Sequence, residues 1–439
     1  MKVMKFGGTS VGKPQRMFEV ARLITKDDER KVVVLSAVSG TTNTLVQIGN
    51  HLYGGKREAA KEVISGLAKQ YDAFLAELVH TSDALEKGRA ILQEHMEFLN
   101  IILRISYSEA LSKDILAQGE LLSTKLFSLY LDEQGIRHEL LPALDFMRID
   151  ANDEPQVEAI RDSLHRLLAQ HPDKRLFITQ GFICRNAKGE VDNLKRGGSD
   201  YSASLIGAAV KASVCEIWTD ISGMHNNDPR VVEKTIPIEQ LSFDEAAELA
   251  YFGAKILHPA SIWPAQQYNI PVRLLNTMEP EAAGTLISET ALSKGVKAIA
   301  AKDGITAVKI KSSRMLLAYG FLRKVFEIFE KYRTPIDMIT TSEVAVSVTI
   351  DNDIALESIV AELQVFGTVD VDRSQTIICI VGNGIADNAT TLQRIFESLQ
   401  DTEVRMVSYG GSQDNISLLV GAEKKVQVLQ QLNNGLFQL

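Results

Sequence analysis

The chain opens with MKVMKFGGTSVGKP, residues 1–14, where a short apolar strand pattern is followed by a glycine-rich loop and the start of a helical pattern. Residues 7–13 match the spacing of a phosphate loop, but that motif continues with Ser or Thr, whose hydroxyl binds magnesium. Pro14 stands there instead and has neither a hydroxyl nor an N–H. The loop therefore predicts another kind of glycine-rich phosphate site, with Lys5 rather than Lys13 as the lysine of interest.

Short apolar strands alternate with long helical patterns over the first 290 residues or so. The helical patterns include residues 57–103, and strands are predicted at residues 1–6, 31–38, 174–183, 213–221 and 269–276. This alternation is typical of an α/β domain with a mostly parallel sheet covered on both faces. Because ligands bind beyond the carboxyl ends of such strands, the segments GGTS, SGTTN, GGSD and TDISG are candidate site loops.

After about residue 300 the pattern changes to two rounds of strand, helix, paired strands and helix. The first round starts at GITAVKI, residues 304–310, and the second at TIICIVGN, residues 376–383. This is a degenerate repeat of the ferredoxin-like βαββαβ order. Two such units after an α/β domain favour a ligand-sensing region over a second catalytic domain.

Composition narrows the possible functions. A length of 439 residues predicts two or three domains, and the net charge of -9 argues against nucleic acid or an anionic membrane as a partner. Cys184, Cys215 and Cys379 lie far apart in apolar runs, so we expect buried thiols rather than ligands or nucleophiles. The sequence has no signal-peptide core and no stretch that approaches a membrane span, which favours a cytoplasmic location.

The first candidate site segment is KFGGTS, residues 5–10. The glycines Gly7 and Gly8 would let backbone N–H groups approach a phosphate, and Ser10 would add a hydroxyl donor. Lys5 at the end of the strand would reach a transferred phosphoryl group. The alternative is a plain turn beside an exposed lysine, since short glycine motifs occur often by chance.

The second segment is NLKRGGSDYSAS, residues 193–204. Free N–H groups at the start of the following helix would attract an anion, and Arg196 would hold a carboxylate through two hydrogen bonds. Asp200 is interpreted as the partner of a lysine or as a group that orders solvent around magnesium. The alternative is a helix start capped by Ser199 or Asp200.

Two further segments contain candidate nucleotide-binding residues. In WTDISGMHNNDPR, residues 218–230, Thr219 and Asp220 follow a strand as adenine- or ribose-binding groups do, and Arg230 would reach a phosphate. A calcium loop is a poor alternative because its closing Glu is missing.

In LSFDEAAELAYFGAKILHP, residues 241–259, Ser242 and Glu245 predict a capping box, and Gly253 is expected to end the helix. Lys255 is a candidate phosphate contact, whereas His258 is expected to be structural.

Together, KFGGTS, RGGSDYSA, WTDISG with DPR, and ELAYFGAKILHP, in this order and before two repeats, resemble the aspartate kinases. The similarity covers essentially the whole chain. It implies an amino-acid-kinase fold over residues 1–292 and two ACT domains over 293–439. One ACT unit, about 312–386, is expected to lie within a unit made of about 296–311 plus 387–439. The length leaves no room for a fused dehydrogenase domain, so a monofunctional form is expected.

The resemblance also implies a reaction and a set of residues. The family phosphorylates the side-chain carboxylate of L-aspartate with MgATP to give 4-phospho-L-aspartate, the first step towards lysine, threonine and methionine. Lys5 would neutralise charge on the phosphoryl group, and Asp200 would hold Lys5. The positions that match aspartate contacts are Thr42, Glu120, Arg196 and Ser199, with Arg196 on the α-carboxylate and Glu120 on the amino group.

The positions that match ATP contacts are Gly7, Gly8, Ser10, Thr219, Asp220, His225, Arg230 and Lys255. His225 departs from the family, which commonly has tyrosine there. An ionised carboxylate needs no general base, so positioning and charge stabilisation are what the site must supply. We expect Mg²⁺ mainly on the ATP phosphates and water, with no protein ligand.

The stretches MLLAYGFLRKVF and IDMITTSEVAVS resemble the lysine-inhibited class of the family. The implied effector residues are Met315, Phe321, Leu322, Asp337, Ser342 and Glu343, with Asp337 meeting the effector amine. Leu317, Ala318 and Pro335 replace residues that are more polar in that class. A homodimer or homotetramer through the ACT domains is expected.

Several alternatives remain at this point. The same fold hosts kinases for glutamate, acetylglutamate, carbamate and UMP, although the paired repeats and ELAYFGAKILHP argue against these. Threonine is an alternative effector. A catalytically silent amino-acid sensor is a third possibility, and the presence of Lys5, Arg196 and Asp200 argues against it.

Overall fold

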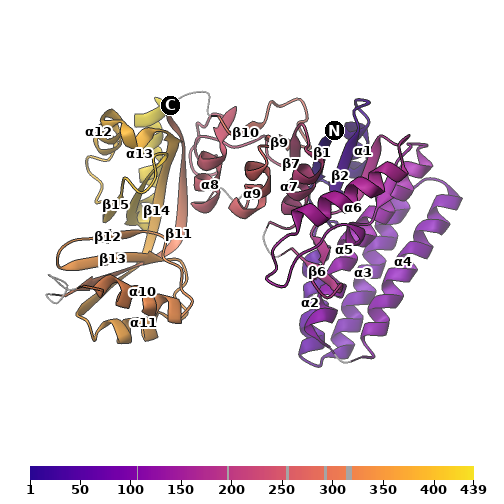
Figure 1. The fold of residues 1–439 in the computed structure, drawn as a ribbon, viewed down its shortest axis with the longest axis horizontal. Coiled ribbons are helices and arrows are strands. Elements are labelled where there is room, and N and C mark those ends of the chain that lie inside the picture. Colours follow the sequence, from indigo (N-terminus) through magenta and orange to yellow (C-terminus); the bar gives the residue numbers. More distant parts are fainter. Residues whose placement is uncertain (106, 195–196, 254–256, 291–293, 313–318) are drawn as a thin grey trace. The chain divides into compact units, whose positions relative to one another are not determined.

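The computed structural model describes residues 1–105, 107–194, 197–253, 257–290, 294–312 and 319–439 (Figure 1). The chain folds into two compact units. The first contains residues 1–224 and 257–289, and the second contains residues 225–256 and 290–439. Among the described residues, no helix is both long enough and apolar enough to cross a membrane.

The first unit is built on a mostly parallel sheet with the strand order β3-β4-β2-β1-β7-β9-β10. Strand β1 lies between β2 and β7 and is parallel to both, whereas β10 runs antiparallel to β9. The strands are β1 (Lys2–Phe6), β2 (Lys31–Leu35), β3 (Glu139–Leu141), β4 (Leu176–Gln180), β7 (Cys215–Thr219), β9 (Val272–Asn276) and β10 (Thr285–Ser288). This confirms the predicted α/β class, and each of the five predicted strand regions contains an observed strand.

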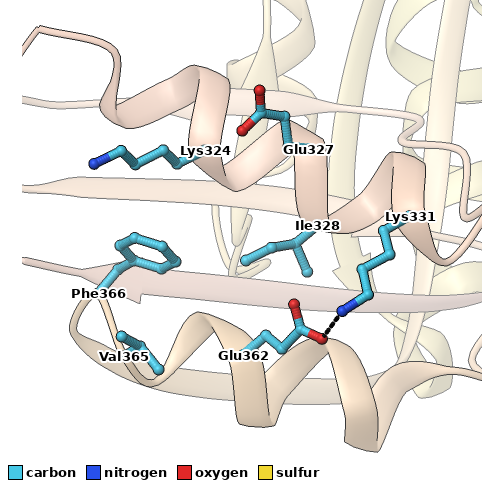
Figure 2. Close-up of a pocket in the computed structure, with 7 residues that line it drawn as sticks. All are labelled: Lys324, Glu327, Ile328, Lys331, Glu362, Val365 and Phe366. Atoms are coloured by element: carbon cyan, nitrogen blue, oxygen red, sulfur yellow. Dashed lines mark hydrogen bonds and ion pairs between the residues drawn. The ribbon is translucent and has the colours of Figure 1, made fainter.

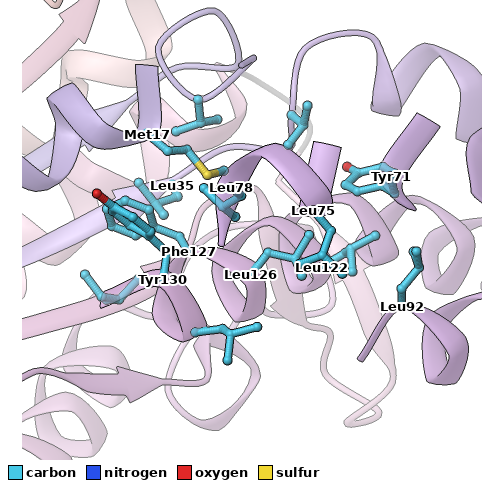
Figure 3. Close-up of a cluster of buried hydrophobic side chains, with 14 of the residues drawn as sticks. Met17, Leu35, Tyr71, Leu75, Leu78, Leu92, Leu122, Leu126, Phe127 and Tyr130 are labelled. Atoms are coloured by element: carbon cyan, nitrogen blue, oxygen red, sulfur yellow. The ribbon is translucent and has the colours of Figure 1, made fainter. Parts of the chain in front are cut away.

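Helices cover both faces of this sheet. They are α1 (Pro14–Ile24), α2 (Thr41–Tyr53), α3 (Arg57–Leu78), α4 (Ser82–Ile102), α5 (Glu109–Glu133), α6 (Val157–Gln170), α7 (Gly198–Val210) and α9 (Pro259–Gln267). Figure 3 shows the core on one face, where Met17 of α1 and Phe127 of α5 lie near Leu35 of β2, and Tyr71 of α3 lies farther along the same cluster. Burial of apolar area of this kind contributes about 25 cal/mol per Å². It fixes α5 against the sheet.

On the opposite face, α7 packs on β1, β2 and β7 and also contacts α6 and α9. A short hairpin of β5 (Ile183–Arg185) and β6 (Val191–Asn193) leads into α7 and contacts α5. The stretch 57–103, expected to be helical, forms α3 and α4. A hydrogen bond from the Ala84 N–H to the Thr81 side chain caps the start of α4.

The second unit begins with β8 (Gln240–Ser242) and α8 (Phe243–Tyr251). The capping box predicted for α8 is confirmed, because the side chains of Ser242 and Glu245 each accept a hydrogen bond from the other residue's backbone N–H. The rest of the unit is a six-stranded antiparallel sheet, β12-β13-β11-β14-β16-β15, with helices α10 to α13. Its elements are β11 (Gly295–Lys311), α10 (Phe321–Lys331), β12 (Ile339–Thr341), β13 (Ala345–Ile350), α11 (Leu356–Leu363), β14 (Thr368–Asn383), α12 (Ala389–Ser398), β15 (Met406–Ser408), β16 (Asn415–Gly421) and α13 (Lys425–Phe437).

Two long strands, β11 and β14, run through both halves of this sheet. Residues 295–302 of β11 pair with residues 377–383, and residues 305–311 pair with residues 368–375. Each half packs in its own core, with Ile299 and Ile378 in one and Val308 and Ile310 in the other. The strands expected at 304–310 and 376–383 are therefore parts of longer strands. The expected domain boundary at residue 292 lies outside the described residues.

Candidate active site

The candidate site lies at the carboxyl edge of the first unit's sheet. There the backbone hydrogen bonding continues one residue past the end of four parallel strands. The N–H groups of Gly7, Ser36, Gly181 and Thr277 donate to the last or next-to-last carbonyl of a neighbouring strand. The segments GGTS, SAVSGTTN and TDISG thus begin side by side, as predicted for a parallel sheet.

Lys5 and Asp200 form a close ion pair at this edge. The Nζ atom of Lys5 lies 2.6 Å from Oδ1 of Asp200, and the side chains are 11% and 18% exposed. Lys5 belongs to the central strand β1, and Asp200 lies in the first turn of α7, which packs on that strand. The helix cap is Gly197, with φ of 67° and no side-chain cap, so neither Ser199 nor Asp200 has the capping role considered above. Asp200 instead fixes the position of a lysine.

Gly7 leaves space around this lysine. A Cβ at Gly7 would lie 3.2 Å from the Nζ atom of Lys5, and a Cβ at Gly8 would lie 3.1 Å from the carbonyl oxygen of Ala37. Both contacts are tighter than ordinary van der Waals contacts. The glycine pair therefore allows the loop to pass closely over the lysine and over Ala37, just beyond the end of β2. The predicted approach of this loop to a phosphate stays a prediction.

Ser199 is held by a partner that the sequence did not single out. The hydroxyl of Ser36 donates to Oγ of Ser199 over 2.9 Å. Gly181 is packed so closely against Ser199 that a Cβ there would lie 2.4 Å from its side chain. The one available signal for Ser36 is its position, a polar residue directly after β2, and Gly181 likewise directly follows β4.

Glu120 presents a buried carboxylate from helix α5. One oxygen, Oε1, accepts a hydrogen bond from the Ala37 N–H over 3.2 Å, while Oε2 is buried and has no hydrogen-bond partner among the described residues. Burial of this residue, which is 4% exposed, raises the pKa of the carboxyl to about 7, although the hydrogen bond from Ala37 acts in the opposite direction. A buried acceptor without a partner is costly, so this oxygen is suited to a donor supplied by a ligand.

Of the other two predicted aspartate contacts, Thr42 and Arg196, the structure describes only Thr42. Thr42 lies in the first turn of α2 and is partly buried. Its neighbour Thr41 bonds through its hydroxyl to the Tyr71 hydroxyl over 2.8 Å, which ties α2 to α3. Arg196, expected to bind the α-carboxylate, lies outside the described residues.

On the predicted nucleotide side, the first unit supplies three polar side chains. The Ser10 hydroxyl is buried and lies 2.7 Å from the Thr277 hydroxyl, so within the protein it fixes the glycine loop to the end of β9. The Thr219 hydroxyl donates to Oδ1 of Asp220 over 3.1 Å, and Asp220 is exposed. The roles of these residues as ATP contacts remain predictions.

His225 and Arg230 belong to the second unit. The Nδ1 atom of His225 lies 2.9 Å from the Thr235 hydroxyl, and burial lowers the pKa of His225. The exposed Arg230 guanidinium makes two hydrogen bonds to Asp228, over 2.9 and 2.8 Å. Lys255 lies outside the described residues.

The described residues contain no group of three His, Cys, Asp or Glu side chains arranged to hold a metal ion. The carboxylates at the sheet edge have donors from the protein: Asp200 has Lys5, Glu120 has the Ala37 N–H, and Asp220 has Thr219. The site is therefore not a cage of free carboxylates. The three cysteines are free and buried, as predicted. His258 caps α9 by accepting a hydrogen bond from the Ala260 N–H, a structural use of this side chain.

In the second unit, two of the predicted effector residues that the structure describes, Asp337 and Ser342, lie at opposite ends of the β12–β13 hairpin. The Asp337 N–H donates to the carbonyl of Thr349 on β13. The Ser342 N–H donates to the carbonyl of Ala345, at the other end of the β12–β13 hairpin. Phe321 is buried at the start of α10, and Leu322 and Glu343 are exposed. Met315, Leu317 and Ala318 lie outside the described residues.

Figure 2 shows a different cavity, of about 350 Å³, between α10 and α11. Lys331 and Glu362 form an ion pair there, with 2.5 Å between Nζ and Oε1, and the aliphatic side chains of Ile328 and Val365 line its apolar part. None of the predicted effector residues that the structure describes lines this cavity.

A mostly parallel sheet with a glycine loop and a paired lysine at its carboxyl edge defines a class of protein, the small-molecule kinases of α/β fold. Comparison with protein families agrees. A model of the amino acid kinase family matches residues 1–276, and a model of the ACT domain matches residues 378–436.

Comparison with individual proteins narrows the class. Lysine-sensitive aspartokinase 3 of Escherichia coli is 34% identical over 99% of both chains. The crystal structure of E. coli aspartokinase III in complex with aspartate and ADP matches with a TM-score of 0.83, 34% identity and full coverage of both chains. A second structure of that enzyme, in complex with lysine and aspartate, matches with a TM-score of 0.82 and 34% identity over 100% of this chain and 99% of that one. The chain belongs to the aspartokinases, within the amino acid kinase family.

Proposed function

We propose that this enzyme transfers the γ-phosphoryl group of ATP to the side-chain carboxylate of L-aspartate, giving 4-phospho-L-aspartate and ADP. The observation that carries the proposal is the ion pair of Lys5 and Asp200 at the sheet edge. One Asp200 oxygen fixes the Lys5 ammonium, which then neutralises charge on the three equatorial oxygens of the phosphoryl group. Preorganised charge of this kind is usually the largest contribution to such a reaction.

The substrate carboxylate acts as the nucleophile. One of its oxygens forms a bond to the γ-phosphorus while the bond from that phosphorus to the β,γ-bridging oxygen of ATP breaks. At neutral pH the carboxylate is already ionised, so no side chain has to remove a proton. The protein's task is to position the two substrates in line.

Binding of the aspartate is assigned to groups around α5 and α7. The Oε2 atom of Glu120, unpartnered among the described residues, would accept a hydrogen bond from the substrate ammonium, which would also favour the ionised form of Glu120. Ser199, oriented by Ser36, would donate to a substrate carboxylate. Arg196 is proposed for the α-carboxylate, and Thr42 for a further contact at the start of α2.

ATP binding is assigned to Gly7, Gly8, Ser10, Thr219, Asp220, His225, Arg230 and Lys255. The complex of the E. coli relative with aspartate and ADP supports a nucleotide site in this family. Mg²⁺ would neutralise part of the triphosphate charge. We assign the ion to ATP phosphates and water, because Mg²⁺ at nucleotide sites is held mainly by substrate phosphates and keeps several waters.

Regulation by an amino acid is the second part of the proposal, with L-lysine as the effector and threonine as the alternative. The complex of the E. coli relative with lysine and aspartate supports this choice. The effector residues would be Met315, Phe321, Leu322, Asp337, Ser342 and Glu343. Because one chain does not bring Asp337 and Ser342 together, we propose a homodimer or homotetramer through the ACT domains of residues 293–439, in the cytoplasm.

A substrate panel tests the catalytic proposal. ADP release by the purified protein with MgATP should depend on L-aspartate and should be at background with L-glutamate, N-acetyl-L-glutamate, carbamate or UMP. Equal turnover with one of these acceptors would contradict the aspartate assignment. No turnover with any acceptor would favour the silent-sensor alternative.

A further inference from the structure

The carboxylate proposed to meet the effector amine already binds an amine of this chain. The Nζ atom of Lys302 lies 2.7 Å from Oδ1 of Asp337, and the Tyr251 hydroxyl donates to the same oxygen over 2.7 Å. The Asp337 side chain is 1% exposed. Its second oxygen, Oδ2, is buried without a hydrogen-bond partner in the part of the chain that is described.

Lys302 has a second anionic partner that can hold it if it leaves Asp337. Its Nζ atom lies 2.9 Å from Oδ2 of Asp351, whose side chain is 40% exposed. The ammonium also stands 4.5 Å from the centre of the Tyr251 ring. Burial by itself would lower the pKa of Lys302, but the hydrogen bonds with Asp337 and Asp351 raise it, so the side chain is a cation. It therefore presents to Asp337 the same chemical group as an amino-acid effector.

A cavity of about 280 Å³ adjoins Asp337 within the second unit. Two carboxylates line it, Asp337 and Glu248 of α8, together with hydroxyl groups that include that of Ser412. The Asn415 amide donates to Glu248 over 2.6 Å. No lysine or arginine is among the described residues that line the cavity, and because Lys302 already pairs with Asp337, the uncompensated negative charge of the lining comes from Glu248. The volume is several times that of one water molecule, which leaves room for a small amino acid.

We propose that Lys302 is a tethered competitor for the effector, whose ammonium group enters this cavity and displaces Lys302 from Asp337 onto Asp351. The inference rests on the proposed function, which gives Asp337 to the effector amine. When an internal group occupies a binding site, an external ligand binds only to the fraction of molecules in which the site is free. Its apparent Kd is the intrinsic Kd divided by that fraction. Lys302 would thus set the effector concentration to which the enzyme responds.

Binding of the effector amine to Asp337 would also affect the end of helix α8. Tyr251 is the last residue of that helix and shares its Asp337 acceptor with Lys302. An incoming ammonium at the same carboxylate therefore competes with a bond that holds the end of α8. This gives the effector a differential contact, which any ligand needs in order to shift a conformational equilibrium.

The test is a binding measurement on the full-length enzyme. Isothermal titration calorimetry with L-lysine would compare wild type with Lys302→Met, which keeps the side-chain length and removes the charge. The matched control is Lys311→Met on the same strand, which removes a surface ion pair with Asp370. Lys302→Gln is the substitute if the methionine variant does not fold. L-norleucine, which lacks the side-chain ammonium, and 6-aminohexanoate, which lacks the α-ammonium, show which of the two groups displaces Lys302.

We expect Lys302→Met to bind L-lysine at least about tenfold more tightly than wild type, a gain that Lys311→Met lacks and that adding Asp337→Asn removes. Unchanged or weaker binding in both Lys302 variants, or no lysine binding by any variant, would overturn the tethered competitor. Aspartate-dependent turnover without lysine is measured on the same samples. It should be retained in Lys302→Met, and its absence from wild type would be a failure of the proposed function instead.

Discussion

The ammonium of Lys5 and the carboxylate of Asp200 lie 2.6 Å apart, on a central strand and on the first turn of the helix that packs against it. Because α7 packs directly on β1, the pair is positioned by two regular elements rather than by a flexible loop. One face of the lysine is bound by Asp200, and Gly7 leaves space beside its Nζ atom.

Replacement of Lys5 by methionine should remove the charge that stabilises the transferred phosphoryl group. We expect kcat to fall by at least about 100-fold, the range found when one preorganised donor is lost. The control is Lys13→Met, at the lysine of the apparent phosphate loop, which should change kcat little. Similar kcat values for the two variants would contradict the role of Lys5.

Asp200→Asn should leave Lys5 charged but poorly fixed. The expected result is a kcat reduced by roughly 10- to 100-fold, with a smaller change in the KM for aspartate, because orientation rather than binding is lost. Asp27→Asn serves as the matched control, since it removes a lysine ion pair, with Lys31, over 2.8 Å. That control should cost stability without changing kcat, and steady-state kinetics distinguish the two.

The pKa of Glu120, raised to about 7 by burial, predicts a pH dependence of substrate binding. Only the ionised carboxylate pairs well with the substrate ammonium, and about 9% is ionised at pH 6 against about 91% at pH 8. The KM for aspartate should therefore be about tenfold higher at pH 6 than at pH 8. The KM for ATP, measured in parallel, serves as the control for general effects of pH. A flat KM over this range would argue against ionic contact with Glu120.

The same pKa predicts the effect of Glu120→Gln on stability. A carboxyl group whose pKa is higher in the folded state contributes stability below its unfolded pKa and loses it as the pH rises through about 7. The glutamine variant without substrate should thus be more stable than wild type at pH 8, by up to roughly 3 kcal/mol, and differ little at pH 4. Urea unfolding at both pH values measures this difference. A variant less stable at pH 8 would contradict the buried, uncompensated carboxylate.

Gly181→Ala should disturb the aspartate site through Ser199. The added Cβ would lie 2.4 Å from the Ser199 side chain, which must then move away from Ser36. We expect the KM for aspartate to rise by about tenfold or more, with a smaller effect on the KM for ATP. Gly66→Ala on α3, where a Cβ meets nothing within 4 Å, is the control and should be neutral or slightly stabilising.

Much of the first unit follows from sequence periodicity. Apolar strands alternate with helices, and because parallel strands end at one edge, KFGGTS and WTDISG were expected to approach each other there. The pairing of Lys5 with Asp200 was expected from the resemblance. The buried state of Glu120 and the bond from Ser36 to Ser199 were not, because they depend on how far α5 and α7 approach β2 in the packed core.

In the second unit, local sequence patterns do not predict the long strand β11 or the contacts of Lys302. Lys302, Asp303 and Gly304 interrupt an apolar run in the sequence, but β11 passes through them with a shift in register. Lys302 then meets Tyr251, Asp337 and Asp351, which come from three other parts of the chain. Such a convergence has no signature at any one position in the sequence.

The most direct test of the central claim is to trap the product. The purified enzyme is incubated with MgATP, L-aspartate and hydroxylamine, and both ADP and the aspartyl hydroxamate formed from an acyl phosphate are measured, with and without L-lysine. The account predicts equal amounts of ADP and hydroxamate, both dependent on L-aspartate and both reduced by L-lysine. ADP release without hydroxamate, or without dependence on aspartate, would contradict it.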